Sequence, residues 1–139
     1  MNSKEQAQAS RISVIRQETE DAENLGSALK MSEHFSPDIV MMSPNMPSVI
    51  GAGNVTDAMR DFFNTFDFEI YYSSEEIVVF GDWAFDRGTY RHKIGPKGSS
   101  KLAEETGKYI WLYSLDPESN WKQARIMWNS SDVPVVNDT

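Results

Sequence analysis

The spacing of apolar positions is helical in the first half of the chain and alternating in the second half. No glycine or proline interrupts the chain from Lys4 to Asn24. Apolar or small side chains recur there every three or four residues, at Ile12, Ile15, Thr19 and Ala22. This spacing predicts one long amphipathic helix, and Gly26 suits its C-terminal cap.

A second, shorter helix and an extended segment are predicted to follow. Ser27 can cap a helix over residues 28–34, and Pro37 prevents that helix from continuing. Residues 38–43 are apolar enough for a short strand. The prolines that come next favour an extended chain up to Gly51, because they cannot donate to a strand ladder.

The pattern then gives one more helix and a series of strands. Asn54 and Asp57 have the spacing of a capping box, which predicts a third helix that ends near Asn64. Stretches rich in aromatic and β-branched residues come after it. They predict strands at 66–72, 75–80, 83–94, 108–115 and 121–130.

The connections between these strands are short, with one exception. Residues 95–107 are polar and rich in glycine, which predicts a long hairpin loop that is exposed and mobile. Helices followed by consecutive strands indicate an α+β fold with an antiparallel sheet. We expect a single domain over residues 1–139, with 1–9 and 133–139 as loose ends.

Composition excludes several classes of protein. The chain has 139 residues, of which 40% are hydrophobic, as in globular proteins. Its net charge of -8 argues against nucleic acid and anionic membrane surfaces as partners. The absence of cysteine excludes disulfides and thiolate metal sites. No apolar run suits a signal peptide or a membrane span, so the expected location is the cytoplasm.

The strand predicted at 108–115 is apolar on both faces. Its odd positions from Tyr109 to Leu115 are aromatic or leucine, and Ile110 and Leu112 lie between them. One face can pack on the helices, but the other needs a second layer. The chain has no further segment to supply that layer, so we expect a homodimer through the outer sheet face.

Several short pieces of the chain follow a family pattern. They are Phe35 to Asp38, Pro44 to Gly51, Gly81 to Ala84 with Gly88, Gly107 to Tyr109, and the strand from Trp121 to Asn129. With the order of the elements, over roughly residues 10 to 132, they resemble the SnoaL-like and ketosteroid-isomerase-like proteins of the nuclear-transport-factor-two-like superfamily. That superfamily hosts isomerases, hydrolases, cyclases, dehydratases and binding modules, so the resemblance indicates a fold more strongly than a function.

The resemblance implies a cone, in which a curved antiparallel sheet wraps around three helices and encloses a mostly apolar pocket. In the steroid-isomerase version, an aspartate base works with a tyrosine and a protonated aspartic acid. Position by position, the resemblance places Ser43 at the base, Thr19 at the tyrosine and Trp111 at the protonated acid. None has the required chemistry, so the steroid-isomerase residues are not retained.

The resemblance also suggests which residues line the pocket. It places Met41 on one wall and Trp128 at a position where the family keeps a pocket aromatic. It points the odd face of strand 83–94 inward, with Phe85, Arg87, Thr89 and Arg91. An inward Arg87 can hold a carboxylate. The alternative is that Arg87 pairs with an acid such as Glu69 or Asp86, or reaches the rim.

Aromatic and titratable residues supply the remaining candidates. Tyr109, Trp111 and Trp128 can stack a flat ligand, although aromatic residues at strand spacing also form cores and interfaces. His34 and Asp86 are the candidate bases, although a histidine at a helix end also simply offsets the helix dipole. No ligand spacing predicts a metal, and no motif predicts an organic cofactor.

Three functions are compatible with this sequence. The preferred one is a pocket protein that binds a small apolar or aromatic molecule, carboxylate-bearing if Arg87 points inward. The second is a proton-transfer enzyme, an isomerase, cyclase or dehydratase, which uses a base at a different position. The third is an interaction module that binds another protein through its sheet face.

Overall fold

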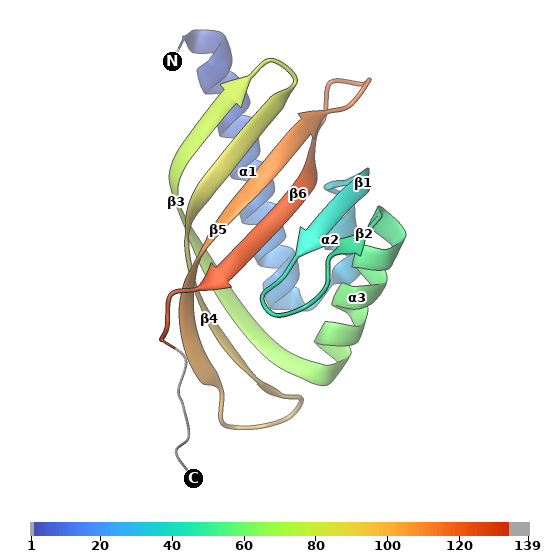
Figure 1. Ribbon diagram of the computed structural model, residues 1–139, viewed down its shortest axis with the longest axis vertical. Helices are drawn as coiled ribbons and strands as arrows, with labels where there is room; N and C mark the ends of the chain where they lie inside the picture. The colour runs from blue at the N-terminus through green and yellow to red at the C-terminus, as the bar shows by residue number, and fades with distance from the viewer. Residues whose placement is uncertain (1, 134–139) are drawn as a thin grey trace.

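The computed structural model describes residues 2–133, which form three helices and one six-stranded sheet (Figure 1). The helices are α1 (Ser3–Leu25), α2 (Ala28–Ser32) and α3 (Ala52–Thr65). The strands are β1 (Phe35–Met42), β2 (Val49–Ile50), β3 (Phe66–Phe80), β4 (Trp83–Pro96), β5 (Ala103–Leu115) and β6 (Trp121–Ser130). They lie in the order β2-β1-β6-β5-β4-β3. The α+β architecture predicted from the sequence is confirmed.

The long first helix is confirmed, and it starts earlier than expected. The Asn2 side chain accepts a hydrogen bond from the Glu5 backbone N–H at 2.9 Å and caps the helix, so residues 3–9 are helical and not a loose end. Gly26 ends the helix with a φ of 70°, as predicted. Of the other expected loose end, residues 134–139 lie outside the described residues.

The capping box predicted for the third helix is wrong, because the helix begins at Ala52, two residues before Asn54. Gly51 precedes it with a φ of 96°, a conformation that glycine adopts readily, and no side chain caps its first turn. The Asn54 side chain instead donates to the Ile50 carbonyl at 3.0 Å. Helix α3 therefore starts at a backbone turn and not at a polar cap.

Strand β3 is continuous where a turn was predicted at Ser73 and Ser74. It pairs with β4 along its whole length, and a bulge between Ser74 and Glu76 accommodates one extra residue. Continuous pairing satisfies the backbone groups that a turn would leave open. The bulge moves the later residues of β3 across to the opposite face.

The long hairpin loop predicted at 95–107 is shorter in the structure, because β4 runs to Pro96 and β5 starts at Ala103. The tip is held against the start of β3. The Lys97 backbone N–H donates to the Thr65 carbonyl at 3.0 Å, and the Gly98 N–H donates to the Asp67 carboxylate at 2.9 Å. These contacts lengthen the ladder beyond what the polar sequence indicated.

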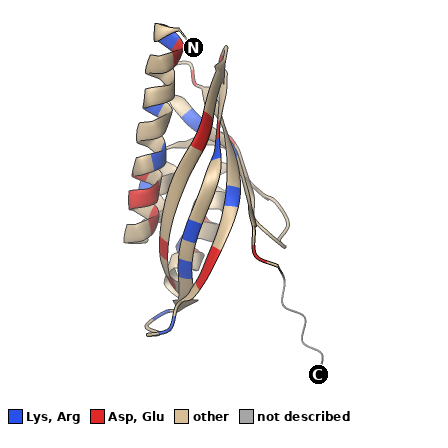
Figure 2. Cartoon of the chain, turned by 90° about the vertical axis from the view of Figure 1, so that its left-hand side faces the viewer, with Lys and Arg blue, Asp and Glu red and all other residues tan. Residues whose placement is uncertain are grey.

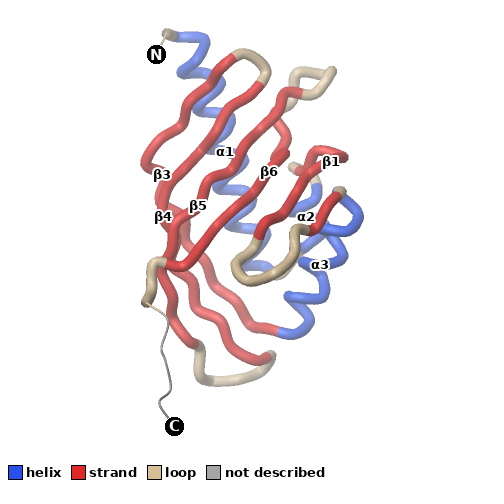
Figure 3. Tube along the Cα trace, in the orientation of Figure 1, coloured by secondary structure: helices blue, strands red, loops and turns tan. Residues whose placement is uncertain are grey.

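The sheet is mixed and strongly curved, and the helices cover only its concave face (Figures 1 and 2). All neighbouring strands are antiparallel except β1 and β6, so the wholly antiparallel sheet expected is corrected at this one pair. Figure 3 shows α1 running along the concave side of β3 to β5, with α3 beside β1 and β2. No helix among residues 2–133 is long and apolar enough to cross a membrane.

Helix α1 is also bonded to the free edge of β3. The Asn24 side chain donates to the Ile70 carbonyl at 2.9 Å and accepts from the Ile70 N–H at 2.7 Å. The Glu20 carboxylate accepts from the Tyr72 N–H at 2.7 Å. Side chains of a helix therefore take hydrogen-bonding positions that a neighbouring strand would otherwise occupy.

Candidate functional site on the concave face

The concave face of β4 carries its even positions. Ala84, Asp86 and Tyr90 are buried, whereas Arg87 and Thr89 are exposed. The expected inward direction of the odd positions is therefore wrong, and Phe85, Arg87 and Thr89 lie on the outer face. The physical reason is that α1 packs over the small and polar even positions, and the long cationic side chains remain in solvent.

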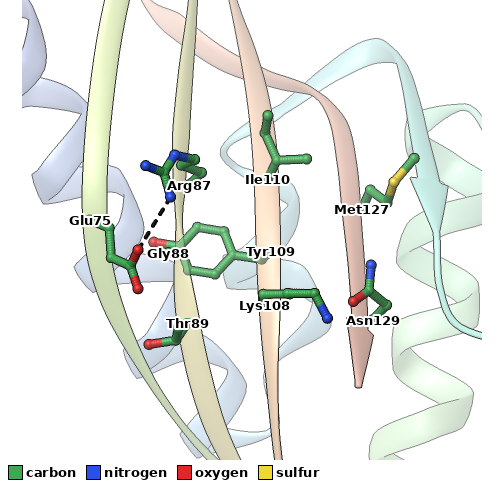
Figure 4. Close-up of a pocket in the computed structure, with 9 residues that line it drawn as sticks. All are labelled: Glu75, Arg87, Gly88, Thr89, Lys108, Tyr109, Ile110, Met127 and Asn129. Carbon is green, nitrogen blue, oxygen red and sulfur yellow. Dashed lines mark hydrogen bonds and ion pairs between the residues drawn. The ribbon is translucent and has the colours of Figure 1, made fainter. Parts of the chain in front are cut away.

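Arg87 forms ion pairs with the neighbouring strand on this outer face. Its Nε donates to Glu76 at 2.7 Å. Its Nη1 donates to Glu75 at 3.2 Å, the contact that Figure 4 shows as a dashed line. The hydrogen bond and the charge of Glu76 raise the pKa of the guanidinium. The alternative expected for Arg87, an ion pair with an acid of the same chain, is confirmed, but the acids are Glu75 and Glu76. A hollow of about 340 Å³ lies beside it, bordered by Thr89 and Lys108.

Four of the predicted pocket residues and the candidate base Asp86 meet on the concave side. Cross-strand pairing aligns Asp86 with Trp111, Trp111 with Ile126, and Ile126 with Met41. The neighbouring pair is Tyr109 with Trp128. Asp86, Tyr109, Trp111 and Met41 are buried, and Trp128 is partly exposed. Their role in binding a ligand stays a prediction.

Asp86 is completely buried and accepts hydrogen bonds from three side chains. Arg16 Nη1 donates to its Oδ2 at 2.9 Å. Ser74 Oγ and Tyr109 Oη both donate to its Oδ1, at 2.5 and 3.1 Å. Burial opposes the charge on Arg16, but the hydrogen bond and charge of Asp86 raise its pKa. These three donors occupy both oxygens of the carboxylate.

A second carboxyl group on this face, Glu23, was not predicted from the sequence. It is buried on α1, and its Oε1 accepts a hydrogen bond from the Tyr72 hydroxyl at 2.6 Å. The pKa of Glu23 is raised to about 8, mainly by burial. The Tyr72 hydrogen bond opposes this rise, and the charge of Glu20 adds to it. Glu23 is therefore mostly a neutral carboxylic acid at pH 7.

Aromatic rings surround the Glu23–Tyr72 pair. The Tyr72 ring meets Trp111 at a centroid distance of 4.8 Å and Tyr109 at 5.4 Å, both edge to face. Several apolar side chains that pack against the core with these rings are only partly buried, namely Met59, Phe62, Phe68 and Trp128. This part of the concave face therefore presents aromatic surface that a flat or cyclic molecule can contact.

A third polar group lies next to Tyr72 on β4. Tyr90 pairs directly with Tyr72, and among residues 2–133 its buried hydroxyl finds no hydrogen-bond partner. The His92 ring stacks on Tyr90 at 5.3 Å, and its Nε2 lies 3.5 Å from Glu105. Burial lowers the pKa of His92, against the opposing charges of Glu105 and Asp132, and favours a neutral imidazole.

The structure gives the remaining candidates other partners or positions. His34 pairs with Glu18 at 2.8 Å beside α1. Ser43 follows the end of β1 and is half-buried. Thr19 is buried, but its hydroxyl donates to the Ile15 carbonyl at 2.8 Å and accepts from Gln123 at 3.0 Å. Thr19 therefore joins α1 to β6.

Two patterns in the sequence could have identified the missed residues. Glu23 follows Thr19 by four positions, so it shares the stripe of the first helix that was predicted to be buried. His92 shares its strand face with Asp86, and it pairs with Glu105 across the hairpin. His92 and Glu105 were missed because the odd positions of β4 were expected to face inward, which would put His92 on the outer face.

Solved structures of similar shape support the fold. A ketosteroid isomerase-like protein from Erwinia carotovora atroseptica matches with a TM-score of 0.81 at 20% identity, over 89% of this chain and 96% of its own. An NTF2-like superfamily protein from Salmonella enterica serovar Typhimurium matches with 0.78 at 12% identity, over 94% and 95%. The chain has the NTF2-like fold.

A third match within the NTF2-like fold is ActVI-ORFA from Streptomyces coelicolor, with a TM-score of 0.75 at 7% identity, over 91% of this chain and 99% of its own. These identities are low, so the matches establish the architecture alone. No protein-family model matches the chain. No curated protein matches it either.

The NTF2-like scaffold carries several acids here, but the described part of the chain does not gather them for a metal. Residues 2–133 contain no group of three or more histidine, aspartate or glutamate side chains placed to hold one ion. The chemistry that these residues themselves offer is hydrogen bonding and proton transfer, from Glu23, Tyr72 and His92.

Proposed function

We propose that the concave face binds a small, mainly apolar cyclic molecule and that Glu23 and Tyr72 act on its oxygen. The observation that carries this proposal is the buried pair itself, in which a neutral carboxylic acid and a phenol lie 2.6 Å apart beside Trp111. If the Tyr72 hydroxyl turns from Glu23 to a ligand oxygen, the phenol and the carboxylic acid both donate to it. Two such donors in an apolar setting stabilise negative charge on that oxygen more strongly than water does.

The proposed reaction class is proton transfer next to a carbonyl or hydroxyl group, as in an isomerase or a lyase. Glu23 supplies the acid that position-by-position comparison would have assigned to Trp111. His92 is the candidate base, because its imidazole is neutral at pH 7 and it is a diagonal neighbour of Tyr72 across β3 and β4. Asp86 and His34 are less suitable, since Asp86 already accepts three hydrogen bonds and His34 lies 2.8 Å from Glu18, closer than the 3.5 Å between His92 and Glu105.

Phenols test the binding part of this proposal, because a phenolate resembles the enolate that such a reaction forms. We expect isothermal titration calorimetry to detect binding of substituted phenols to the wild type. The Tyr72→Phe substitution should weaken it about tenfold or more, through loss of a hydrogen bond to a charged oxygen. Binding should also weaken above pH 8, as Glu23 ionises.

Tyr71→Phe is the matched control for this experiment. Tyr71 is the next residue on β3, but it lies on the outer face and is 47% exposed. Its substitution should leave phenol affinity unchanged. The proposal fails if no phenol or cyclic enone binds the wild type, or if both tyrosine variants bind equally well.

We also propose that two copies of the chain associate through the outer sheet face. None of the three helices within residues 2–133 covers this face (Figure 2). An outer apolar patch crosses it in paired rows, and consists of Val78, Phe80, Trp83, Phe85, Ile110, Leu112 and Met127. Phe80 and Trp83 are 52% and 40% exposed, which is unusual for such large rings. A second copy would supply the missing layer.

Light scattering after size exclusion tests this association. We expect a mass of twice 15.8 kDa at micromolar concentration, and a single-chain mass for the Trp83→Glu variant, because a buried charge disfavours the interface. Leu29→Glu is the control, since Leu29 is 69% exposed on α2, away from the patch. A 15.8 kDa wild-type protein would contradict the proposal.

A further inference from the structure

Asp86 touches each of the three elements that carry the proposed site. Arg16 comes from α1, Ser74 from β3 and Tyr109 from β5, and all three donate to the same carboxylate. Asp86 itself lies on β4 and has no exposed surface. One buried side chain thus connects four elements of the fold.

Each of these contacts leads on to the Glu23–Tyr72 pair. Arg16 lies two turns before Glu23 on the same helix, so the ion pair fixes the position of α1. Ser74 lies two residues after Tyr72 on the same strand. The Tyr109 ring packs against the Tyr72 ring. The geometry of the pair therefore depends on Asp86 by three routes.

We propose that Asp86 is a positioning residue that holds Tyr72 and Glu23 in hydrogen-bonding contact. The effect of Asp86 on catalysis rests on the proposed function, but its contacts with α1, β3 and β5 do not depend on that function. In this proposal Asp86 acts through its hydrogen-bond partners and not on the substrate. It keeps α1 against the sheet, so that water stays away from Glu23.

The local backbone is shaped for this contact. The β3 bulge brings the Ser73 and Ser74 backbone over Gly88, where there is space only because residue 88 has no side chain. This approach allows Ser74 Oγ to reach Asp86 from the neighbouring strand. The small size of Gly88 and the bulge in β3 together allow Ser74 to donate to the Asp86 carboxylate.

The titration of Glu23, followed by NMR of the labelled side-chain carboxyl carbon, tests the inference without any ligand. In Asp86→Asn and in Tyr109→Phe, α1 and Tyr72 should loosen and admit water. The midpoint of the Glu23 titration should then fall by about one pH unit or more. Tyr113→Phe is the control, because among residues 2–133 the buried Tyr113 hydroxyl has no hydrogen-bond partner.

A midpoint in Tyr109→Phe equal to that of the wild type overturns the inference, whether or not Asp86→Asn folds. An equal fall in Tyr113→Phe also overturns it, since the effect would then reflect general loosening. Phenol binding separates this inference from the proposed function. Phenol binding can be lost in Tyr72→Phe while the midpoint of the Glu23 titration in Tyr109→Phe equals that of the wild type. In that case the proposed function stands and the positioning role of Asp86 does not.

Discussion

Replacement of Glu23 by glutamine should stabilise the protein at pH 7 and above by a few kcal/mol. The folded pKa of about 8 lies above the ordinary value of 4.5, so the folded chain retains a proton that the unfolded chain releases. The wild type should therefore be most stable below pH 4.5 as far as this group is concerned. It should lose stability as the pH rises from there to about 8.

Urea unfolding followed by tryptophan fluorescence, at intervals from pH 5 to pH 9, measures this effect. The Glu23→Gln variant should show a much flatter dependence on pH, because glutamine does not ionise. Glu118→Gln provides a control in an exposed turn. Parallel curves for the wild type and Glu23→Gln would show that Glu23 ionises normally in the folded protein. They would also remove the main support for the proposed acid.

The opposite effect on stability is expected for Gly88→Ala. A β-carbon at this position would collide with the Ser73 carbonyl oxygen and lie 2.8 Å from the Ser74 Cα. Both are backbone atoms, so β3 has to shift, and Asp86 then loses its Ser74 hydrogen bond. We expect a loss of about 3 kcal/mol or more in the free energy of unfolding.

Gly53→Ala is the matched control for this substitution. Gly53 lies within α3, and a β-carbon there would meet nothing within 4 Å. Alanine should therefore be neutral or stabilise the helix by up to about 1 kcal/mol. If thermal or urea unfolding shows both variants to be equally stable, the close approach at Gly88 is not a constraint on the fold.

Elements that are determined by residues close together in the sequence were predicted better than elements that depend on distant strand partners. The first helix and its Gly26 cap follow from local spacing and backbone conformation, and both were predicted. The continuous β3 was not predicted, because two serines look like a turn unless the partner strand is known. The parallel pairing of β1 with β6 depends on contacts between distant parts of the chain, which no local pattern contains.

The candidate site was harder to predict, for the same reason. Tyr109 and Trp111 were expected to line the concave face, and both are buried there. Asp86 was chosen as a candidate base, but the expected direction of β4 put it on the outer face. That direction was wrong, since alternation identifies two faces without saying which one α1 covers. Glu23 was missed because an acid on a helix is usually a solvent-exposed residue. Only the packing of Tyr72 against it shows that this one is buried.

The bonds from Asn24 and Glu20 to β3 have a consequence for assembly. A strand from another molecule cannot add at Ile70 or Tyr72, because the backbone groups there already have partners on α1. Growth of the sheet from one molecule to the next is therefore blocked along this stretch. The proposed association through the uncovered face, by contrast, would end once two copies had met, so it would favour closed pairs over open-ended fibres.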